Sequence, residues 1–219
     1  MPCKLAIFDF DGTLADTFDW FIAVVNEVAD KFRFRRIEPH EVETLRGYEA
    51  RRIIRHLQVP MWKMPLVARE MRCRMSRDIG TIALFPGVDE MLERVAGRGV
   101  ALAVVTSNSA ENVRRVLGPR NIALIRHLEC GAAVLGKRPR LRKVLRAAGV
   151  APGEAICIGD EIRDLHAARA EGIPFGAVTW GFTRGDALRA LAPEAVFKRM
   201  EEIAEMVAGG DGRSGLFQA

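Results

Sequence analysis

The 219-residue chain lacks features that would suit it to a membrane or to an oxidising compartment. No apolar run approaches the roughly 20 residues that a membrane-spanning helix needs. We also expect no signal peptide, because an apolar strand pattern begins within a few residues of the N-terminus. The four cysteines form no Cys-x-x-Cys pair, which argues against a zinc site and a disulfide framework. These absences predict a cytoplasmic protein without a membrane partner.

Aromatic side chains are scarce, and positive charge is in only modest excess. The chain has one tyrosine, and its net charge is +5. A nucleic-acid-binding protein would concentrate basic residues in a patch with aromatic partners. Here the arginines are spread among acidic residues along helical segments. We therefore expect a solvated basic surface and no nucleic-acid partner, although arginines near a site would attract anionic substrates.

The chain does contain short, nearly continuous apolar runs. They occupy residues 4–9, 100–105, 155–159 and 175–179. Such runs are typical of strands that are buried on both faces of a parallel sheet. Spaced apolar positions predict helices at residues 87–97, 109–117, 138–149, 161–171 and 184–191. Alternating strands and helices predict a doubly wound, mostly parallel α/β sheet.

One long interval interrupts this alternation. Between Leu14 and about Leu84 no convincing strand is evident, and the apolar spacing is helical. These ~65 residues are too long for a simple crossover connection, so we expect a separate, all-helical domain inserted into the α/β domain. The predicted units are an α/β core at residues 1–14 and 84–208, a helical domain at 15–83, and a flexible, glycine-rich tail at 209–219.

The first apolar run ends on two aspartates. Asp9 and Asp11 are separated by one residue and followed by a turn at Gly12 and Thr13. Open α/β sheets bind ligands at the carboxyl ends of their strands, so we expect both carboxylates at a binding edge. Two acids this close repel each other, and a divalent cation with oxygen ligands, above all Mg²⁺, would relieve the repulsion. The plain alternative is an acidic turn with no further role.

A second strand end carries hydroxyl groups. Thr106, Ser107 and Asn108 follow the run at 100–105. Hydroxyl and backbone N–H groups at a strand-to-helix junction suit phosphate oxygens. The adjacent hydroxyls of Thr106 and Ser107 leave open which of them faces a ligand, and Ser109 could simply cap the next helix.

A lysine and two more acids complete the candidate site. Lys137 precedes the helix expected at 138–149, where an ammonium group would neutralise an anionic centre. Asp160 and Asp164 follow the run at 155–159, and one helical turn would bring them close enough to face one metal ion. The alternatives are a solvated basic cluster and ordinary acids in the first turn of a helix.

In this order along the chain, the four segments resemble the motifs of the haloacid dehalogenase-like superfamily. The matching segments are Asp9-Phe-Asp11-Gly-Thr-Leu, Thr106-Ser-Asn, Gly136-Lys137 and Gly159-Asp160-Glu-Ile-Arg-Asp164. The resemblance covers nearly the whole chain and implies the superfamily's Rossmann-like core. Residues 15–83 stand where the phosphoglycolate phosphatase-like branch carries a helical cap.

The resemblance implies a Mg²⁺-dependent phosphomonoester hydrolase that acts through an aspartyl-phosphate. It makes Asp9 the nucleophile and Asp11 the general acid/base. The dehalogenase and phosphonate-cleaving branches lack the second aspartate, so Asp11 argues for phosphate ester chemistry. The other roles that it implies are phosphoryl and substrate contacts from Thr106, Ser107, Asn108 and Lys137, and metal binding by Asp9, Asp11 (backbone carbonyl), Asp160 and Asp164.

The substrate is expected to be a small phosphorylated metabolite. The resemblance to the phosphoglycolate phosphatase-like branch makes phosphoglycolate the first candidate. In the cap, Gly47 and Arg51 could reach the substrate, or they could belong to an ordinary charged helix surface. Two other functions stay open, a β-phosphoglucomutase-like sugar phosphomutase and a non-catalytic regulatory protein. The sequence does not predict the oligomeric state.

Overall fold

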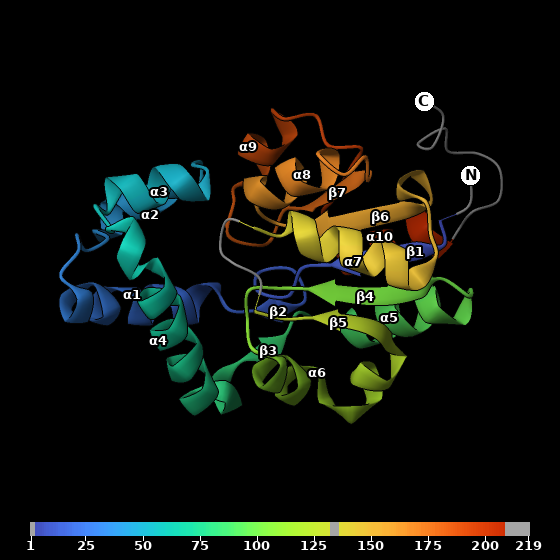
Figure 1. The fold of residues 1–219 in the computed structure, drawn as a ribbon, viewed down its shortest axis with the longest axis horizontal. Helices are drawn as coiled ribbons and strands as arrows, with labels where there is room; N and C mark the ends of the chain where they lie inside the picture. The colour runs from blue at the N-terminus through green and yellow to red at the C-terminus, as the bar shows by residue number, and fades with distance from the viewer. Residues whose placement is uncertain (1–2, 132–135, 209–219) are drawn as a thin grey trace.

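The computed structural model describes residues 3–131 and 136–208, and it confirms the predicted α/β sheet with a helical insertion (Figure 1). The strands of the main sheet are β1 (Leu5–Phe8), β4 (Ala101–Val105), β5 (Ile125–Glu129), β6 (Ala155–Gly159), β7 (Phe175–Val178) and β8 (Ala195–Phe197). Their order is β5-β4-β1-β6-β7-β8, and every neighbouring pair is parallel. The tail predicted at 209–219 lies outside the described residues.

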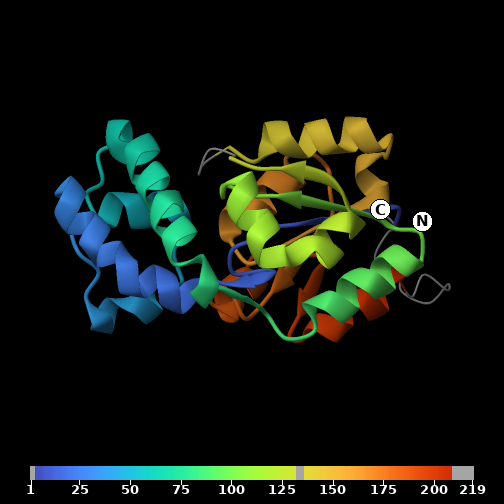
Figure 2. The ribbon, with the colours of Figure 1, turned by 90° about the horizontal axis from the view of Figure 1, so that it is seen from below.

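Helices cover both faces of this sheet. One face carries α5 (Val88–Gly97), α6 (Ala110–Leu124) and α10 (Met200–Ala208), and Figure 2 shows α5 and α10 side by side. The other face carries α7 (Arg138–Ala148), α8 (Ile162–Arg169) and α9 (Gly185–Arg189). Because side chains alternate along a strand, Phe8 of β1 joins the first core and Ile7 joins the second. Both faces of β1 are therefore fully buried, which explains its continuous apolar sequence.

β1 lies at the topological switch point of the sheet. From β1 the chain builds β4 and β5 on one side, and it then crosses to the other side to build β6, β7 and β8. Ligands of open α/β sheets bind beside the carboxyl ends of the strands at such a point. Asp9 directly follows β1, so the order of the strands places this carboxylate where a ligand site is expected.

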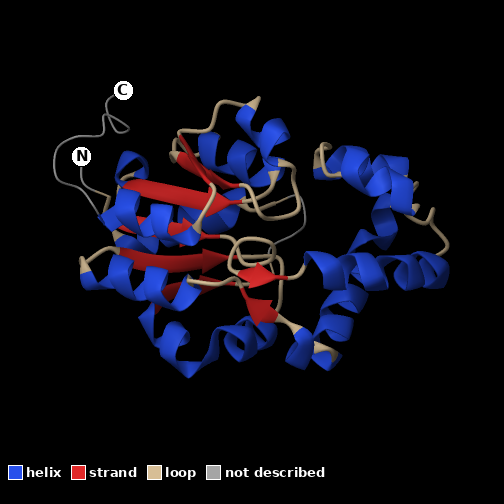
Figure 3. Ribbon diagram, turned by 180° about the vertical axis from the view of Figure 1, so that it is seen from behind, coloured by secondary structure: helices blue, strands red, loops and turns tan. Residues whose placement is uncertain are grey.

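The helical insertion leaves the sheet after β1 and returns before α5. Its two ends are joined by a short antiparallel pair, β2 (Ala15–Asp16) and β3 (Ala83–Leu84). Between them lie the helices that we call the cap: α1 (Phe18–Phe32), α2 (Val42–Leu45), α3 (Ala50–His56) and α4 (Met64–Arg77). The carboxyl ends of the strands point toward the cap (Figures 1 and 3). The exact domain bounds stay a prediction.

Short 3₁₀ helices supplement these elements. They are Pro39–Glu41, Met61–Lys63, Ile79–Thr81 and Pro152–Glu154. No helix among the described residues combines the length and the apolar character needed to cross a membrane.

The sequence pattern missed elements at the edges of the fold. β5 and β8 are the edge strands of the sheet. Neither forms a recognisable apolar run, because β5 contains polar residues and β8 is only three residues long. The helix predicted at 109–117 extends to Leu124, because helical backbone resumes after a kink at Gly118, whose φ is 70°. Helix α10, which packs beside α5, was also missed.

Candidate active site

Asp9 and Asp11 lie in a tight turn that follows β1. The Phe10 carbonyl accepts hydrogen bonds from three later backbone N–H groups, and the Phe10 N–H donates to Asp9 Oδ1 at 2.7 Å. Gly12 has a φ of 77°, and a Cβ at this position would overlap the carboxylate of Asp160. Glycine is therefore needed here both for its backbone conformation and for the close approach of Asp160.

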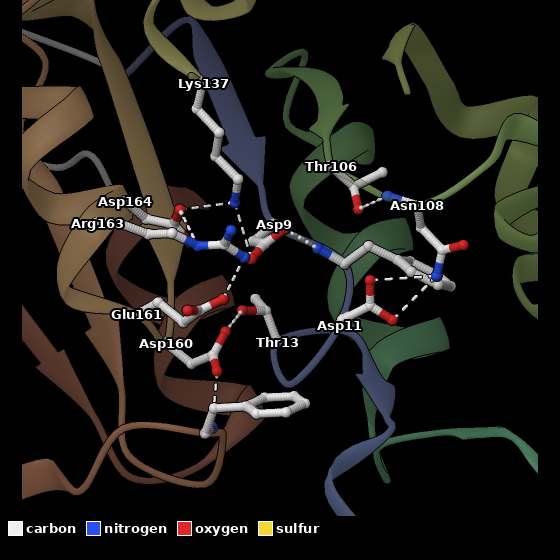
Figure 4. Close-up of polar contacts among 12 residues, drawn as sticks. Asp9, Asp11, Thr13, Thr106, Asn108, Lys137, Asp160, Glu161, Arg163 and Asp164 are labelled. Atoms are coloured by element: carbon white, nitrogen blue, oxygen red, sulfur yellow. Dashed lines mark hydrogen bonds and ion pairs between the residues drawn. The ribbon is translucent and has the colours of Figure 1, made fainter. Parts of the chain in front are cut away.

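A buried lysine bridges two acidic side chains. Lys137 Nζ lies 2.8 Å from Asp9 Oδ2 and 2.8 Å from Asp164 Oδ1 (Figure 4). The three side chains are at most 5% exposed, so water screens these attractions only weakly. Lys137 immediately precedes α7, and Pro139 suits the start of that helix because the first turn does not need its missing N–H.

Asp9, Asp160 and Asp164 form a buried acidic cluster. One oxygen from each carboxylate lies within 4.8 Å of the others. Asp160 Oδ1 accepts a hydrogen bond from Thr13 Oγ1 at 2.8 Å, and its Oδ2 accepts one from the Phe182 N–H at 2.7 Å. Within the described residues, the buried Asp164 Oδ2 accepts no hydrogen bond. Leaving a buried acceptor unpaired is costly, and oxygen donors suit divalent cations, so these residues fit a metal ion.

Burial and charge separate the pKa values of these acids. Burial, assisted by neighbouring acids, raises the pKa of Asp160 well above its ordinary value. Burial also raises the pKa of Asp164, to about 8, despite the opposing charge of Lys137. Asp9 is equally buried, but the positive charges of Lys137 and Arg163 outweigh that effect and lower its pKa. Asp9 is thus the member of the cluster that stays ionised.

Asp11 lies in a different environment from the other acids. Its two carboxylate oxygens accept hydrogen bonds from Asn108 Nδ2 at 3.0 and 3.2 Å. Burial, followed by the negative charge of Asp9, raises the pKa of Asp11 to about 7. Near neutral pH this carboxyl can both donate and accept a proton, which is what a general acid/base must do.

The loop after β4 positions the predicted hydroxyl groups. Thr106 is fully buried, and its Oγ1 accepts a hydrogen bond from the Asn108 N–H at 3.0 Å (Figure 4). Ser109 Oγ accepts one from the Asn112 N–H at 3.1 Å, so this serine caps α6. Ser107 lies between them and lines the cavity in front of the acids.

The cap contacts the loop that contains Gly181 and Phe182, and this loop donates a hydrogen bond to Asp160. Arg46 Nη2 donates to the Gly181 carbonyl at 2.9 Å, and its Nε donates to the Phe182 carbonyl at 3.2 Å. The ring of Phe182 packs edge-to-face against Phe18 and Phe21 of α1, with both centroids 5.4 Å away. Because the Phe182 N–H also bonds to Asp160, the position of the cap is connected to that of a candidate metal ligand.

A cavity of about 300 Å³ lies between the acids and the cap. Its wall on the core side includes Asp9, Asp11, Ser107 and Asn108. Of the two predicted cap contacts, Arg51 lies exposed on α3, and Gly47 follows α2. Neither lines the cavity, whereas their neighbours Arg46, Tyr48 and Ala50 do.

Sequence reasoning missed several residues of the site. Arg163 forms an ion pair with Glu161, and its charge helps to lower the pKa of Asp9. Thr13 and Phe182 hold the carboxylate of Asp160 from two other segments. Arg163 and Thr13 lie within motif segments, whereas Phe182 lies outside all four. Arg163 acts on Asp9, and Thr13 and Phe182 contact Asp160, across sequence separations that a local pattern does not reveal.

Comparison with known proteins agrees with this geometry. The family model described as haloacid dehalogenase-like hydrolase matches residues 6–178. The phosphoglycolate phosphatase of Synechococcus elongatus is 30% identical over 202 residues, which cover 92% of this chain and 95% of the relative. That of Xanthomonas campestris is 30% identical over 197 residues, covering 84% and 86%.

Solved structures show the same fold. CbbY from Rhodobacter sphaeroides in complex with phosphate aligns with a TM-score of 0.69 and 24% identity, covering 92% of this chain and 96% of that chain. A protein from Clostridium acetobutylicum described as a predicted phosphatase aligns with a TM-score of 0.80 and 17% identity, covering 95% and 100%.

The chain belongs to the haloacid dehalogenase-like hydrolase family. The resemblance inferred from four motifs is therefore confirmed, including the similarity to the phosphoglycolate phosphatase-like branch. The predicted enzyme class, a phosphatase of this family, is confirmed as well. The roles of individual residues stay predictions.

Replacing Lys137 should destabilise the protein in a pH-dependent way. Lys137→Met leaves Asp9 and Asp164 without their buried cation, and breaking a buried ion pair in this way costs about 3–5 kcal/mol. In the variant the pKa of both acids rises, so they bind protons in the folded state. The loss of unfolding free energy in urea should therefore be smaller near about pH 5 than near about pH 8.

Lys143→Met is the matched control, because Lys143 is 64% exposed and pairs with Glu129 at the surface. It should change the unfolding free energy by at most about 1 kcal/mol. Equal stability of the two variants would contradict the assigned importance of Lys137.

Binding of Mg²⁺ should stabilise the protein more strongly as the pH rises. The raised pKa values of Asp160 and Asp164, the latter about 8, mean that the metal-free folded protein holds protons that the unfolded chain releases. Metal binding must displace these protons. The Mg²⁺-induced rise in Tm should thus be larger near about pH 8 than near about pH 6. The release of protons on binding should make the calorimetric binding enthalpy depend on the ionisation enthalpy of the buffer.

Asp160→Asn should remove this stabilisation, whereas Asp186→Asn, at a 64% exposed side chain, should keep it. A rise in Tm that survives in Asp160→Asn would place the metal elsewhere.

Proposed function

We propose that the protein is a Mg²⁺-dependent phosphomonoester hydrolase that forms an aspartyl-phosphate on Asp9. The observation that carries this proposal is the contrast between two neighbouring carboxyls. Asp9 is held ionised by Lys137 and Arg163, whereas the pKa of Asp11 is raised to about 7. One carboxylate is thus suited to attack, and the other is suited to transfer protons.

In the first step, an oxygen of Asp9 attacks the phosphorus atom of the ester. A bond forms between Asp9 and phosphorus while the bond from phosphorus to the leaving oxygen breaks. Protonated Asp11 transfers its proton to the leaving oxygen, so an alcohol departs rather than an alkoxide. Asn108, which bonds to both Asp11 oxygens, would keep this carboxyl in position.

In the second step, water attacks the phosphorus atom of the aspartyl-phosphate. Asp11, now ionised, takes a proton from that water as the new bond forms. The bond between phosphorus and Asp9 breaks, inorganic phosphate is released, and both aspartates return to their starting states. The same carboxyl therefore acts as acid and then as base, for which a pKa near the working pH is suited.

One positive side chain and one polar loop support this chemistry. Lys137 pairs with Asp9 at 2.8 Å and would remain beside the transferring phosphoryl group, where a preorganised charge stabilises developing negative charge. Thr106, with Ser107 and Asn108, supplies polar groups at the end of the neighbouring strand β4. We expect this loop to contact phosphoryl oxygens.

The acidic cluster would hold Mg²⁺. The proposed ligands are the side chains of Asp9, Asp160 and Asp164 and the backbone carbonyl of Asp11. When bound, the ion would neutralise charge on the phosphoryl oxygens. Thr13 and the Phe182 N–H would orient Asp160 through the two hydrogen bonds that they donate to it.

The names of the relatives suggest a small phosphorylated metabolite, with phosphoglycolate as the first substrate to test. Arg46 and Arg72 of the cap line the cavity near the core, where an arginine could meet the carboxylate of such a substrate. Gly47 and Arg51 stay weaker proposals, because neither lines the cavity.

Asp9→Asn should abolish phosphate release, because the amide is not a competent nucleophile. Asp11→Asn should lower kcat by about 10²- to 10⁴-fold, the usual contribution of a general acid/base. The assay is sustained release of inorganic phosphate from phosphoglycolate with and without Mg²⁺, which also distinguishes a hydrolase from a phosphomutase. Asp186→Asn at the surface serves as the control.

Full activity of Asp9→Asn would show that the nucleophile is misassigned. Equal rates of phosphate release with and without Mg²⁺ would instead contradict the proposed cofactor.

A further inference from the structure

The cavity beside the acids continues into the cap and changes character on the way. At the core end it is lined by Asp9, Asp11, Ser107, Asn108 and Arg163. At the cap end its lining is almost entirely apolar, with Val25 of α1, Ile54 of α3 and Val67 of α4 among the contributing side chains. One continuous space therefore joins a polar, charged end at the proposed nucleophile to an apolar end inside the cap.

The cap does not fill its own interior. Its buried apolar cluster consists of Val25, Ile37, Leu45, Leu57 and Val59, and the other apolar side chains that pack against this cluster are only partly buried. Helix α3 contributes no fully buried side chain, and α4 buries only Met75. Large residues such as Phe21, Phe34 and Met64 are partly exposed and line the cavity.

An apolar hollow of this kind has a physical cost unless something occupies it. Protein interiors are normally close-packed, and atoms that line an empty space lose their dispersion contacts. Apolar pockets that open onto a few convergent polar groups are the usual form of a small-molecule site. The continuity of this hollow with Asp9 points to the substrate itself as the occupant.

The charged cap residues lie near the core rather than deep in this hollow. Arg46 contacts the Gly181 and Phe182 carbonyls, and Arg72 Nη1 donates to the Ser107 carbonyl at 3.4 Å. A carboxylate or hydroxyl group placed beyond these arginines would meet mainly apolar side chains and lose its hydration without compensation. The deep part of the cavity therefore selects against polar leaving groups.

We propose that the preferred substrates are phosphomonoesters of alcohols that carry an apolar alkyl or aryl group. The phosphoryl group lies at Asp9, and the apolar group extends past Arg46 and Arg72 into the cap. This inference rests on the proposed hydrolase function and narrows its substrate class. The reaction is unchanged: the ester oxygen leaves with a proton from Asp11, and the products are an apolar alcohol and inorganic phosphate.

A series of n-alkyl phosphates tests this proposal. Ethyl, butyl, hexyl and octyl phosphate, each below its micellar concentration, have leaving groups of nearly equal intrinsic reactivity. Their kcat/KM should rise by about fourfold per added methylene until the cavity is filled, the fold-change equivalent to about 0.8 kcal/mol per buried CH₂. The longer esters should also exceed phosphoglycolate.

Ala68→Phe fills part of the cavity, because Ala68 of α4 lines it. It should lower the ratio of kcat/KM for octyl phosphate to that for ethyl phosphate by about 15-fold or more, the equivalent of losing two or more buried CH₂ groups. Ala23→Phe is the matched control, since Ala23 lies exposed on α1 outside the lining, and it should leave the ratio unchanged. If Ala68→Phe abolishes turnover, the octyl-to-ethyl ratio of kcat/KM is measured instead in the variant with the smaller change, Ala68→Leu.

The outcomes separate this inference from the proposed function. Rising kcat/KM along the series, with a lower ratio in the Ala68 variant, supports the apolar substrate class. A flat or falling series with good turnover of phosphoglycolate overturns it and leaves the hydrolase intact. No Mg²⁺-dependent phosphate release from any ester, phosphoglycolate included, overturns the proposed function itself.

Discussion

The site depends on one buried cation between acids that would otherwise repel each other. Lys137 lies 2.8 Å from both Asp9 and Asp164, and all three side chains are almost completely buried. Without this charge, burial would drive Asp9 toward its neutral form, as it does Asp160. In the proposed mechanism, the distribution of charge at the carboxyl edge of the sheet therefore assigns the nucleophile, the acid that transfers protons and the acids that would hold a metal ion.

The cap and the core are connected through the same acids. Arg46 bonds to the carbonyl groups of Gly181 and Phe182, and the N–H of Phe182 bonds to Asp160. A movement of the cap would thus affect the loop that orients a candidate metal ligand. Because the cap also provides most of the apolar cavity, the proposed fit of the substrate is connected to the geometry of the candidate metal site. This arrangement suits an enzyme whose core performs one reaction while its cap selects the leaving group.

The sequence was sufficient for the central part of the fold and for most of the candidate site. Strands such as β1 are buried on both faces, so their continuous apolar runs are recognisable, and residues that follow them must meet at one edge. Edge strand β5, with Arg126, His127 and Glu129, offers no such run. The hydrogen bond from Thr13 to Asp160 joins positions 147 residues apart, and local sequence patterns do not predict such a pair. The cavity in the cap is likewise a product of packing, because the same apolar spacing predicts a filled helical bundle.

The most direct test of the account is to trap the phosphoryl group on the enzyme. Asp11→Asn should slow the second step, and an aryl phosphate, whose leaving group needs little protonation, should still complete the first. Acid quenching after reaction with ³²P-labelled aryl phosphate should then give a base-labile label on the peptide that contains Asp9. Label on any other residue, or label that persists when Asp9→Asn is added, would contradict the central claim that Asp9 is the nucleophile.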